Sequence, residues 1–441
     1  MNCDLSFANI YGWRATYRSE WAVVEGFLVI RFCIDGGDQT GYMQPIGEGD
    51  FTRIIPLLSE DAHRRGEPLR LVGLTTEGWQ QLNQAWEGLF AAEADRAMSD
   101  YIYRREELSR LTGKHYQPKR NHCNRFRTLY PDVRYEELGR AHFAACLELE
   151  REWCRQREGC REGTLHSELQ AMESAFAHFE ELGLRGGVLM DGERIVAFTY
   201  GSAVSEHCFV IHAEKADTRY EGAFAMINRT FAERLEERFE WINREEDLGI
   251  EGLRKAKLSY CPSLLLDKYM AVELSEKAQA CRRLWQEAFP NDEQEFVYRF
   301  LLHYFKEEQM LCRKAEDAIV AMAHAIPFAT PIGRIDYLYA VATTSAMQGR
   351  GLASELIEEA VERAAQRGCV AVALIPADGR LRAYYEARGF EGDYPIRLVT
   401  RDHFDFGTGD VERDRAMIRW CGTHKELYTT LEATYCEEKQ L

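Results

Sequence analysis

The chain has 441 residues, with 72 acidic side chains against 55 lysines and arginines and 46% apolar residues. This length predicts two to four domains of roughly 100–200 residues, and the apolar share can fill a core in each of them. The net charge of −17 argues against a protein that coats nucleic acid, because phosphate contacts dominate non-specific affinity. It leaves room for a local basic patch that meets one anionic ligand.

The sequence contains no candidate membrane span and no metal motif. The longest apolar stretch, from Trp21 to Ile34, is interrupted by Glu25, Gly26 and Arg31. The first residues lack the basic and apolar regions of a signal peptide. The 13 cysteines are scattered without a CxxC pair, and the 12 histidines form no HExxH or HxH pattern. We therefore expect free thiols, no bound metal and a cytoplasmic location.

The first part of the chain alternates strand-like and helix-like segments. A hairpin is expected within residues 187–202, because Asp191-Gly192 is a strong turn signal between apolar runs. The other elements predicted here are two strands within 20–32 turned at Glu25-Gly26, helices at 50–65 and 76–92, a strand at 132–138, mostly helix over 140–182, a strand at 206–213 and a helix at 222–238.

A basic stretch interrupts this acidic chain between Arg104 and Arg127. Only Glu106 and Glu107 oppose its cations, which gives a local excess of positive charge. The cations are Arg104, Arg105, Arg110, Lys114, Lys119, Arg120, Arg125 and Arg127. Such a patch could meet a phosphate or a carboxylate.

Residues 274–440 repeat the alternation of helices and strands. We expect helices within 276–309, at 350–367 and at 379–388, with strands near 318–328, 335–343 and 369–375. Strand, glycine turn, helix and strand in succession are typical of an α/β arrangement. The change of pattern places a domain boundary near Leu274, which gives domains at 1–273 and 274–441.

The most specific signal is the loop Gln348-Gly-Arg-Gly-Leu-Ala, which opens a long amphipathic helix after a strand. Glycines permit close backbone approach, and the first helical turn leaves N–H groups that suit a pyrophosphate. Thirty or so residues later comes Tyr385-Glu-Ala-Arg-Gly-Phe. Together these two motifs resemble the signature of the GNAT acyl-CoA transferase superfamily, over about residues 275–400.

This resemblance implies an acyl-CoA, such as acetyl-CoA, as co-substrate and direct acyl transfer to an amine in a ternary complex. It implies that Tyr385 is the catalytic acid that protonates the leaving thiolate; the alternative is a tyrosine that only packs its ring. The residues that it implies for acyl-CoA binding are Ala340, Val341, Ala342, Gln348, Gly349, Arg350, Gly351, Leu352 and Ala353. No general base can be read from the sequence, and Asp336 and Glu355 are candidates only by their proximity in the chain.

Two further stretches stand out before residue 273. Lys119-Arg-Asn lies in the basic stretch, and residues 242–262 combine clustered acids and bases with two glycines. These markers resemble an uncharacterised bacterial family related to the C-terminal domain of phosphatidylglycerol lysyltransferases and, more distantly, to Fem-type aminoacyltransferases. The resemblance implies tandem GNAT-like folds, with halves near 1–110 and 111–273, and mixed central sheets flanked by helices throughout the chain. The substrate-binding candidates are Lys119, Arg120, Asn121, Asn243, Arg244, Asp247, Arg254 and Lys257.

Three functions remain open from the sequence. The leading one is an acyltransferase that moves an acetyl or related acyl group to an amine, with an N-terminal half that recognises or transfers an aminoacyl group. The second is an aminoacyl-tRNA-dependent transferase with an accessory CoA-binding domain, for which the basic stretch would contact tRNA. The third is a non-catalytic ligand-binding module. The acceptor and the oligomeric state are not encoded in any motif.

Overall fold

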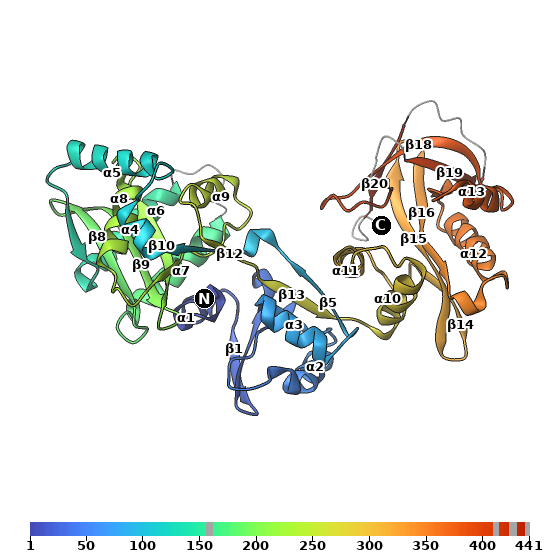
Figure 1. The fold of residues 1–441 in the computed structure, drawn as a ribbon, viewed down its shortest axis with the longest axis horizontal. Helices are drawn as coiled ribbons and strands as arrows, with labels where there is room; N and C mark the ends of the chain where they lie inside the picture. Colours follow the sequence, from blue (N-terminus) through green and yellow to red (C-terminus); the bar gives the residue numbers. More distant parts are fainter. Residues whose placement is uncertain (156–161, 409–413, 423–429, 437–441) are drawn as a thin grey trace. The chain divides into compact units, whose positions relative to one another are not determined.

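The computed structural model describes residues 1–155, 162–408, 414–422 and 430–436 (Figure 1). The chain forms two compact units: Met1–Glu87 with Glu93–Val272, and Gly88–Ala92 with Glu273–Leu441. The described residues form three sheets, each containing parallel and antiparallel pairs, with helices around them. This arrangement confirms the predicted mixed α/β class. None of the described helices combines the length and the apolar composition that a bilayer span requires.

The first sheet has the order β1-β2-β3-β4-β13-β5. Its strands are β1 (Glu20–Val24), β2 (Phe27–Cys33), β3 (Thr40–Met43), β4 (Arg70–Leu74), β5 (Phe90–Ala94) and β13 (Tyr269–Glu273). The accompanying helices are α2 (Ile55–Arg64) and α3 (Thr76–Ala85), whereas α1 (Phe7–Trp13) packs against α7 (Glu162–Ala177) beside the second sheet. The hairpin of β1 and β2 turns at Glu25 and Gly26, as predicted. The last strand of this unit, β13, returns to pair with β4.

One predicted helix is too long. The sequence predicts helix over 76–92, whereas α3 ends at Ala85 and residues from Phe90 onward form strand β5. Gly88, with φ of 82°, lies between the two and takes a conformation that interrupts a helix. Phe90-Ala-Ala-Glu-Ala has good helix formers, so pairing within the sheet overrides its intrinsic propensity.

The second sheet has the order β12-β6-β11-β10-β9-β8-β7. Its strands are β6 (Asp100–Arg104), β7 (Arg134–Glu137), β8 (Arg185–Asp191), β9 (Arg194–Ala203), β10 (Cys208–Ala216), β11 (Trp241–Asn243) and β12 (Leu264–Leu266). The helices are α4 (Arg105–Arg110), α5 (Gln117–Leu129), α6 (Phe143–Arg155), α7 (Glu162–Ala177), α8 (Ala223–Arg234) and α9 (Glu251–Leu258). The hairpin predicted around Asp191-Gly192 is present as β8 and β9.

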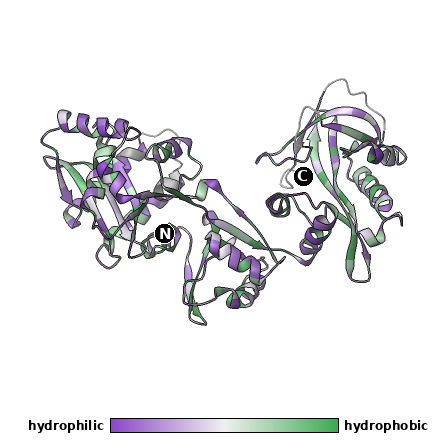
Figure 2. Ribbon diagram, in the orientation of Figure 1, coloured by the Kyte–Doolittle hydropathy of each residue, from purple (hydrophilic) through white to green (hydrophobic). Residues whose placement is uncertain are grey.

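Alternating side chains of this sheet fill two apolar layers. Val188 and Phe198 pack with the helices α6 and α7, while Leu189 and Ala197 pack with α5 and α8. Figure 2 shows α5 as largely hydrophilic, and only Cys123 and Phe126 of that helix are buried. The helices therefore cover both faces of the sheet.

The second unit contains the third sheet, with the order β14-β15-β16-β17-β19-β18-β20. Its strands are β14 (Met310–Ala315), β15 (Ala318–Thr330), β16 (Gly333–Thr343), β17 (Ala371–Leu374), β18 (Glu391–Val399), β19 (Arg415–Trp420) and β20 (Leu431–Tyr435). The helices are α10 (Glu276–Ala288), α11 (Gln294–His303), α12 (Leu352–Gln366) and α13 (Gly379–Glu386). The expected helices and strands of residues 276–388 are all present, with small shifts of their ends.

Candidate functional site

The loop Gln348–Ala353 leads into helix α12. Gly349 and Gly351 have φ of 76° and 85°, and Gly351 is the N-cap residue. A Cβ added at either position would meet no atom within 4 Å, so the glycines serve the backbone conformation and not a close contact. No side chain caps this helix start among the described residues, and the loop is exposed. Its first amides are therefore available to an anion.

The loop is anchored from its N-terminal side. The carboxylate of Glu287, at the end of α10, accepts hydrogen bonds from the backbone N–H of Ser345 (2.7 Å) and from its hydroxyl (2.8 Å). These bonds hold the short 3-10 turn Ser345–Met347 that precedes Gln348. The position of the glycine loop is thus tied to α10 as well as to strand β16.

Strand β16 has lost one of its two neighbouring strands at the predicted acyl-CoA-binding residues Ala340, Val341 and Ala342. Its parallel pairing with β17 ends at Tyr337, whereas its antiparallel pairing with β15 continues to Thr343. Ala340 has φ of 48° and lies at an irregularity of the register with β15. The backbone of this segment is consequently displaced from a regular ladder beside the glycine loop that follows it.

Helix α13 places two adjacent tyrosines in different surroundings. Tyr385 is 8% exposed and packs in the core, with its ring centroid 5.8 Å from that of Phe390. The Tyr384 hydroxyl instead lies 3.1 Å from that of Ser354, and Arg388 stacks on its ring and donates to Ser354. Burial, with a smaller contribution from Tyr384, raises the pKa of Tyr385 to about 12. Tyr385 is therefore a protonated phenol at neutral pH.

An aromatic cluster that the sequence analysis missed surrounds Tyr339 on β16. Its ring centroid lies 5.7 Å from Trp285, 5.6 Å from Phe300 and 5.0 Å from Phe406. Burial, followed by the charges of Asp292 and Asp405, raises the pKa of Tyr339 well above its ordinary value. These residues come from four separate segments, so no local motif marks them.

The two acids considered as general bases are already engaged. The Asp336 carboxylate is fully buried and pairs with Arg367, at the end of β16 that still pairs with β17. Glu355 accepts from Arg313 at 3.0 Å. Neither geometry favours a base beside Ala340–Ala342.

In the first unit, Lys119 and Arg244 come together around Glu214. Arg244 donates to Glu214 at 2.9 Å, and Asn228 donates to the other carboxylate oxygen at 2.9 Å. The Lys119 ammonium lies 3.9 Å from the ring centroid of Tyr260; burial and, second, the charge of Arg244 lower its pKa to about 8. In the described part of the chain, Nη1 of Arg244 and Oδ1 of Asn228 are buried without a partner. The cluster therefore keeps unused hydrogen-bonding groups.

Most of the other predicted substrate-binding residues have structural partners. Asp247 is fully buried and accepts from Arg254 (2.8 Å) and Tyr101 (2.6 Å), and Lys257 donates to the backbone carbonyls of residues 244–246. The amide of Asn243 bonds Asp100 and the Met1 carbonyl. Arg120 donates to the Gly113 carbonyl and Asn121 is exposed. The contacts of Asn243, Asp247 and Lys257 shape the loop at 243–249 and do not converge on the Glu214 cluster.

Three cations of the predicted basic stretch pair with acidic side chains in the fold. Arg104 pairs with Glu240 and stacks on Trp241, while Arg110 pairs with Glu106 and Arg125 with Glu221. Lys114 and Arg127 remain solvent-exposed. The local excess of charge seen in the sequence is thus reduced on the folded surface.

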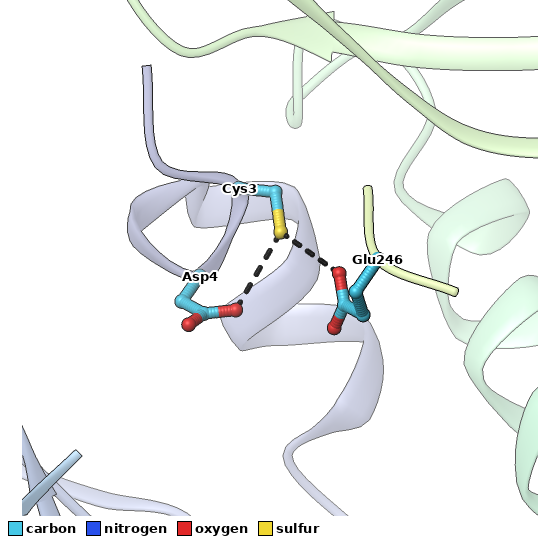
Figure 3. Close-up of side chains that lie close together, drawn as sticks. All are labelled: Cys3, Asp4 and Glu246. Carbon is cyan, nitrogen blue, oxygen red and sulfur yellow. Dashed lines mark hydrogen bonds between the residues drawn. The ribbon is translucent and has the colours of Figure 1, made fainter. Parts of the chain in front are cut away.

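A buried cluster joins the start of the chain to its later segments. Figure 3 shows Cys3, Asp4 and Glu246 facing one another, with the thiol donating to Asp4 at 3.5 Å and to Glu246 at 3.3 Å. The Lys268 ammonium lies 3.0 Å from carboxylate oxygens of both Asp4 and Asp100 and 3.7 Å from Glu246. This ammonium provides the positive charge that a metal ion would otherwise supply among these acids.

The surroundings of Glu246 predict how the free energy of unfolding depends on pH. Burial raises the pKa of Glu246 to about 7, although the charge of Lys268 opposes the shift. The unfolded carboxyl has a pKa near 4.3, so the folded state binds this proton more tightly than the unfolded state does. The bound proton therefore contributes to the free energy of unfolding at low pH, and this contribution is lost as the pH rises from about 4 to 7. The free energy of unfolding of the Glu246→Gln variant is therefore expected to fall less over this range than that of the wild type.

Urea unfolding at a series of pH values measures this difference. Glu237→Gln, which changes an exposed carboxylate of the same unit, is the control and should follow the wild type. Identical pH slopes for wild type and Glu246→Gln would contradict the raised pKa.

The comparisons with known proteins agree with this architecture. Residues 1–272 match the family model described as phosphatidylglycerol lysyltransferase, C-terminal. The chain belongs to this family. Residues 278–390 match the acetyltransferase (GNAT) family model. A phosphatidylglycerol lysyltransferase C-terminal domain is thus joined to a GNAT acetyltransferase domain, which confirms both resemblances found in the sequence.

Individual relatives are similar over parts of the chain. A conserved protein of unknown function from Bacteroides thetaiotaomicron VPI-5482 is 45% identical, with a TM-score of 0.58, over 62% of this chain and 91% of that one. A GNAT family N-acetyltransferase from Escherichia coli, solved in complex with CoA, is 17% identical, with a TM-score of 0.29, over 38% of this chain and 89% of that one. An uncharacterized protein from Mycoplasmoides gallisepticum is 22% identical over 173 residues, 39% of this chain; the match spans about half, 55%, of that relative.

Proposed function

We propose that the second unit transfers an acetyl or related acyl group from acyl-CoA to an amine. The observation that carries this proposal is the exposed glycine loop with two positive φ angles at the uncapped start of α12. It supports a pyrophosphate site at Gln348, Gly349, Arg350, Gly351, Leu352 and Ala353. The neighbouring segment Ala340–Ala342, which leaves the pairing with β17, offers backbone groups to the amides of a pantetheine arm.

The surroundings of Tyr339 favour an amine as the acceptor. Aromatic rings attract cations, and the charges of Asp292 and Asp405 act on the same side chain. An ammonium bound beside Tyr339 would be attracted to its ring and to these two carboxylates before it loses its proton to become a nucleophile.

Tyr385 is the proposed acid for the leaving thiolate. A thiol has a pKa of about 8.5, so a phenol whose pKa is about 12 remains protonated and can donate a hydrogen bond as the thiolate develops. Among the described residues, no hydrogen bond contributes to the pKa of this hydroxyl, which leaves the group available to a ligand.

A pair of tyrosine variants tests this role. Tyr385→Phe is expected to lower turnover by about 100-fold at saturating acyl-CoA, the lower range for loss of a general acid, while the dissociation constant of acetyl-CoA stays within a few-fold. Tyr384→Phe is the matched control, since that hydroxyl bonds Ser354, and should keep most of the turnover. Steady-state assays measure the first quantity and calorimetric titration the second. Turnover of Tyr385→Phe as high as that of Tyr384→Phe would show that Tyr385 is not the catalytic acid.

Native mass spectrometry of the full chain with acetyl-CoA tests the proposed function as a whole. We expect one bound molecule per chain, followed by acetylation of some members of an amine panel. No binding at millimolar acetyl-CoA would overturn the acetyl donor and direct the search to longer acyl-CoAs. Two molecules per chain would extend thioester binding to the first unit.

A second candidate function for the first unit is the recognition of an aminoacyl group. Membership of the phosphatidylglycerol lysyltransferase C-terminal family and the unpartnered atoms of Arg244 and Asn228 beside Glu214 favour it. Delivery by aminoacyl-tRNA would make binding strongly salt-dependent, whereas a small amine or free amino acid would not. Filter binding of aminoacyl-tRNA between 50 and 200 mM salt separates these two cases.

A further inference from the structure

A serine, a histidine and a glutamate of the first unit form a hydrogen-bonded series. The Ser202 hydroxyl lies 2.8 Å from Nε2 of His212, and Nδ1 of the same ring lies 3.0 Å from Oε1 of Glu245. Ser202 belongs to β9, His212 to β10 and Glu245 to the loop after β11. None of these residues takes part in the acyl-CoA site or in the Glu214 cluster described above.

Local backbone irregularities hold two members of the series. The pairing of β10 with β9 is regular up to Ile211 and shifts before Ala213, so His212 is the extra residue of a bulge. Glu245 has φ of 57°, which is unusual for a residue other than glycine. Bulges redirect side chains, and strained conformations persist where the surroundings fix them. Both features aim side chains at a common point.

The hydrogen bonds set the direction of proton movement. A carboxylate can only accept, so Glu245 accepts from Nδ1–H, and it also accepts from the Asn9 amide at 2.8 Å. Nε2 is then the unprotonated nitrogen and accepts from the Ser202 hydroxyl. The Ser6 hydroxyl lies 3.1 Å from that of Ser202 and takes no part in this proton transfer. This polarity is the one that activates a serine as a nucleophile.

A pocket lies next to the series. Its cavity volume is about 30 Å³, and His212 and Tyr200 belong to its lining. Small and apolar side chains from two helices, among them Ala8 and Gly12 of α1 and Ala171 and Met172 of α7, share the rest of the lining with Asn9 and Glu168. Ser202 is 4% exposed and follows Tyr200 by two residues, on the same face of β9. Such a lining suits a short apolar acyl group.

We propose that Ser202 is a nucleophile that takes an acyl group from a small apolar ester bound in this pocket, with His212 as general base and Glu245 as the residue that orients the imidazole. The serine oxygen forms a bond to the ester carbonyl carbon, and the bond from that carbon to the leaving alkoxide breaks. The serine proton passes to Nε2 of His212 and from there to the alkoxide. Water then attacks the acyl-serine by the same route and releases the acid.

A fluorophosphonate probe and p-nitrophenyl butyrate test this proposal on the full-length chain. The probe bonds a nucleophilic serine oxygen to phosphorus and releases fluoride. We expect one adduct per chain, located at Ser202 by peptide mass spectrometry, and none in Ser202→Ala. His212→Asn should slow labelling and ester hydrolysis by at least 100-fold, the range for loss of a general base. Glu245→Gln should slow both by at least tenfold.

Ser6→Ala is the matched control. It removes a hydrogen bond from Ser202 without touching His212, so a merely structural network would be damaged by it as much as by the other variants. We expect it to keep labelling within a few-fold of the wild type. An unlabelled wild-type chain, an adduct at another residue, or His212→Asn labelling as fast as wild type would each overturn the proposal. Binding of acetyl-CoA by Ser202→Ala should be unchanged, so failure here is distinguishable from failure of the proposed acyl-CoA function.

Discussion

Replacing Gly351 by valine is expected to weaken acetyl-CoA binding by roughly tenfold to a hundredfold. A β-branched residue at φ of 85° is strained by about 1–3 kcal/mol, and the backbone relieves this strain by rotating away from the conformation that presents the first amides of α12. Steric crowding does not enter, because nothing lies within 4 Å of the added Cβ. Isothermal titration of the purified variant with acetyl-CoA measures the loss.

Gly368→Val is the control for this experiment. Gly368 follows the other end of α12, has φ of 75° and also has no atom within 4 Å of an added Cβ. The two substitutions therefore strain the same helix to a similar extent but at opposite ends. The 15 residues of α12 span about 22 Å at 1.5 Å per residue. Similar losses in thermal stability, with binding affected only by Gly351→Val, are expected. Equal loss of binding in both variants would show that strain in the helix, and not the loop itself, lowers the affinity.

The second large effect is expected from Lys268→Met, which should lower the free energy of unfolding of the first unit by about 3–5 kcal/mol. Removing the cation from a buried ion cluster leaves its acids uncompensated. Lys268 is 4% exposed, and its ammonium lies 3.0 Å from both Asp4 and Asp100. The methionine side chain has a similar length, so the packing is kept while the charge is lost.

The pH dependence separates charge from packing in this variant. Without the ammonium, the buried carboxyls can avoid repulsion by binding protons, so the loss should be smaller at pH 5.5 than at pH 8. Hydrogen exchange of peptides from the first unit, in urea at both pH values, measures it. Lys255→Met, at an exposed position, should change stability by no more than about 0.5 kcal/mol. A loss for Lys268→Met that does not depend on pH would assign the effect to packing.

The sequence predicted the elements whose signals are local. The Asp191-Gly192 hairpin and the long helix after Gly351 depend on turn residues and on apolar periodicity, and both are present. The helix predicted through residue 92 is wrong at its C-terminal end. An alanine-rich segment favours a helix in isolation, whereas pairing within the sheet determines that Phe90–Ala94 forms strand β5.

The contacts between polar side chains that lie far apart in the chain were harder to predict from the sequence. Lys119 and Arg244 were selected as candidates, but their meeting around Glu214 depends on α5, β10 and α8 being folded together. Asp247 and Lys257 are charged residues of the kind that bind ligands, yet in this fold they hold the backbone of a loop through hydrogen bonds. The relation of Ser202 to His212 depends on a one-residue bulge, which no periodicity in the sequence reveals.

The return of β13 to the first sheet has a consequence for how the chain acquires its structure during synthesis. Strand β4 finds its partner β13 only after the whole second sheet has been translated, and Cys3 meets Lys268 across 265 positions of sequence. Contacts of such long range are slow to form, since the intervening loop must be closed before they contribute. The earliest-made segments therefore depend on the latest-made strand of their unit, so a ribosome-bound chain shorter than about 270 residues cannot complete this sheet. The two sheets of the first unit are expected to be committed to folding together rather than in succession.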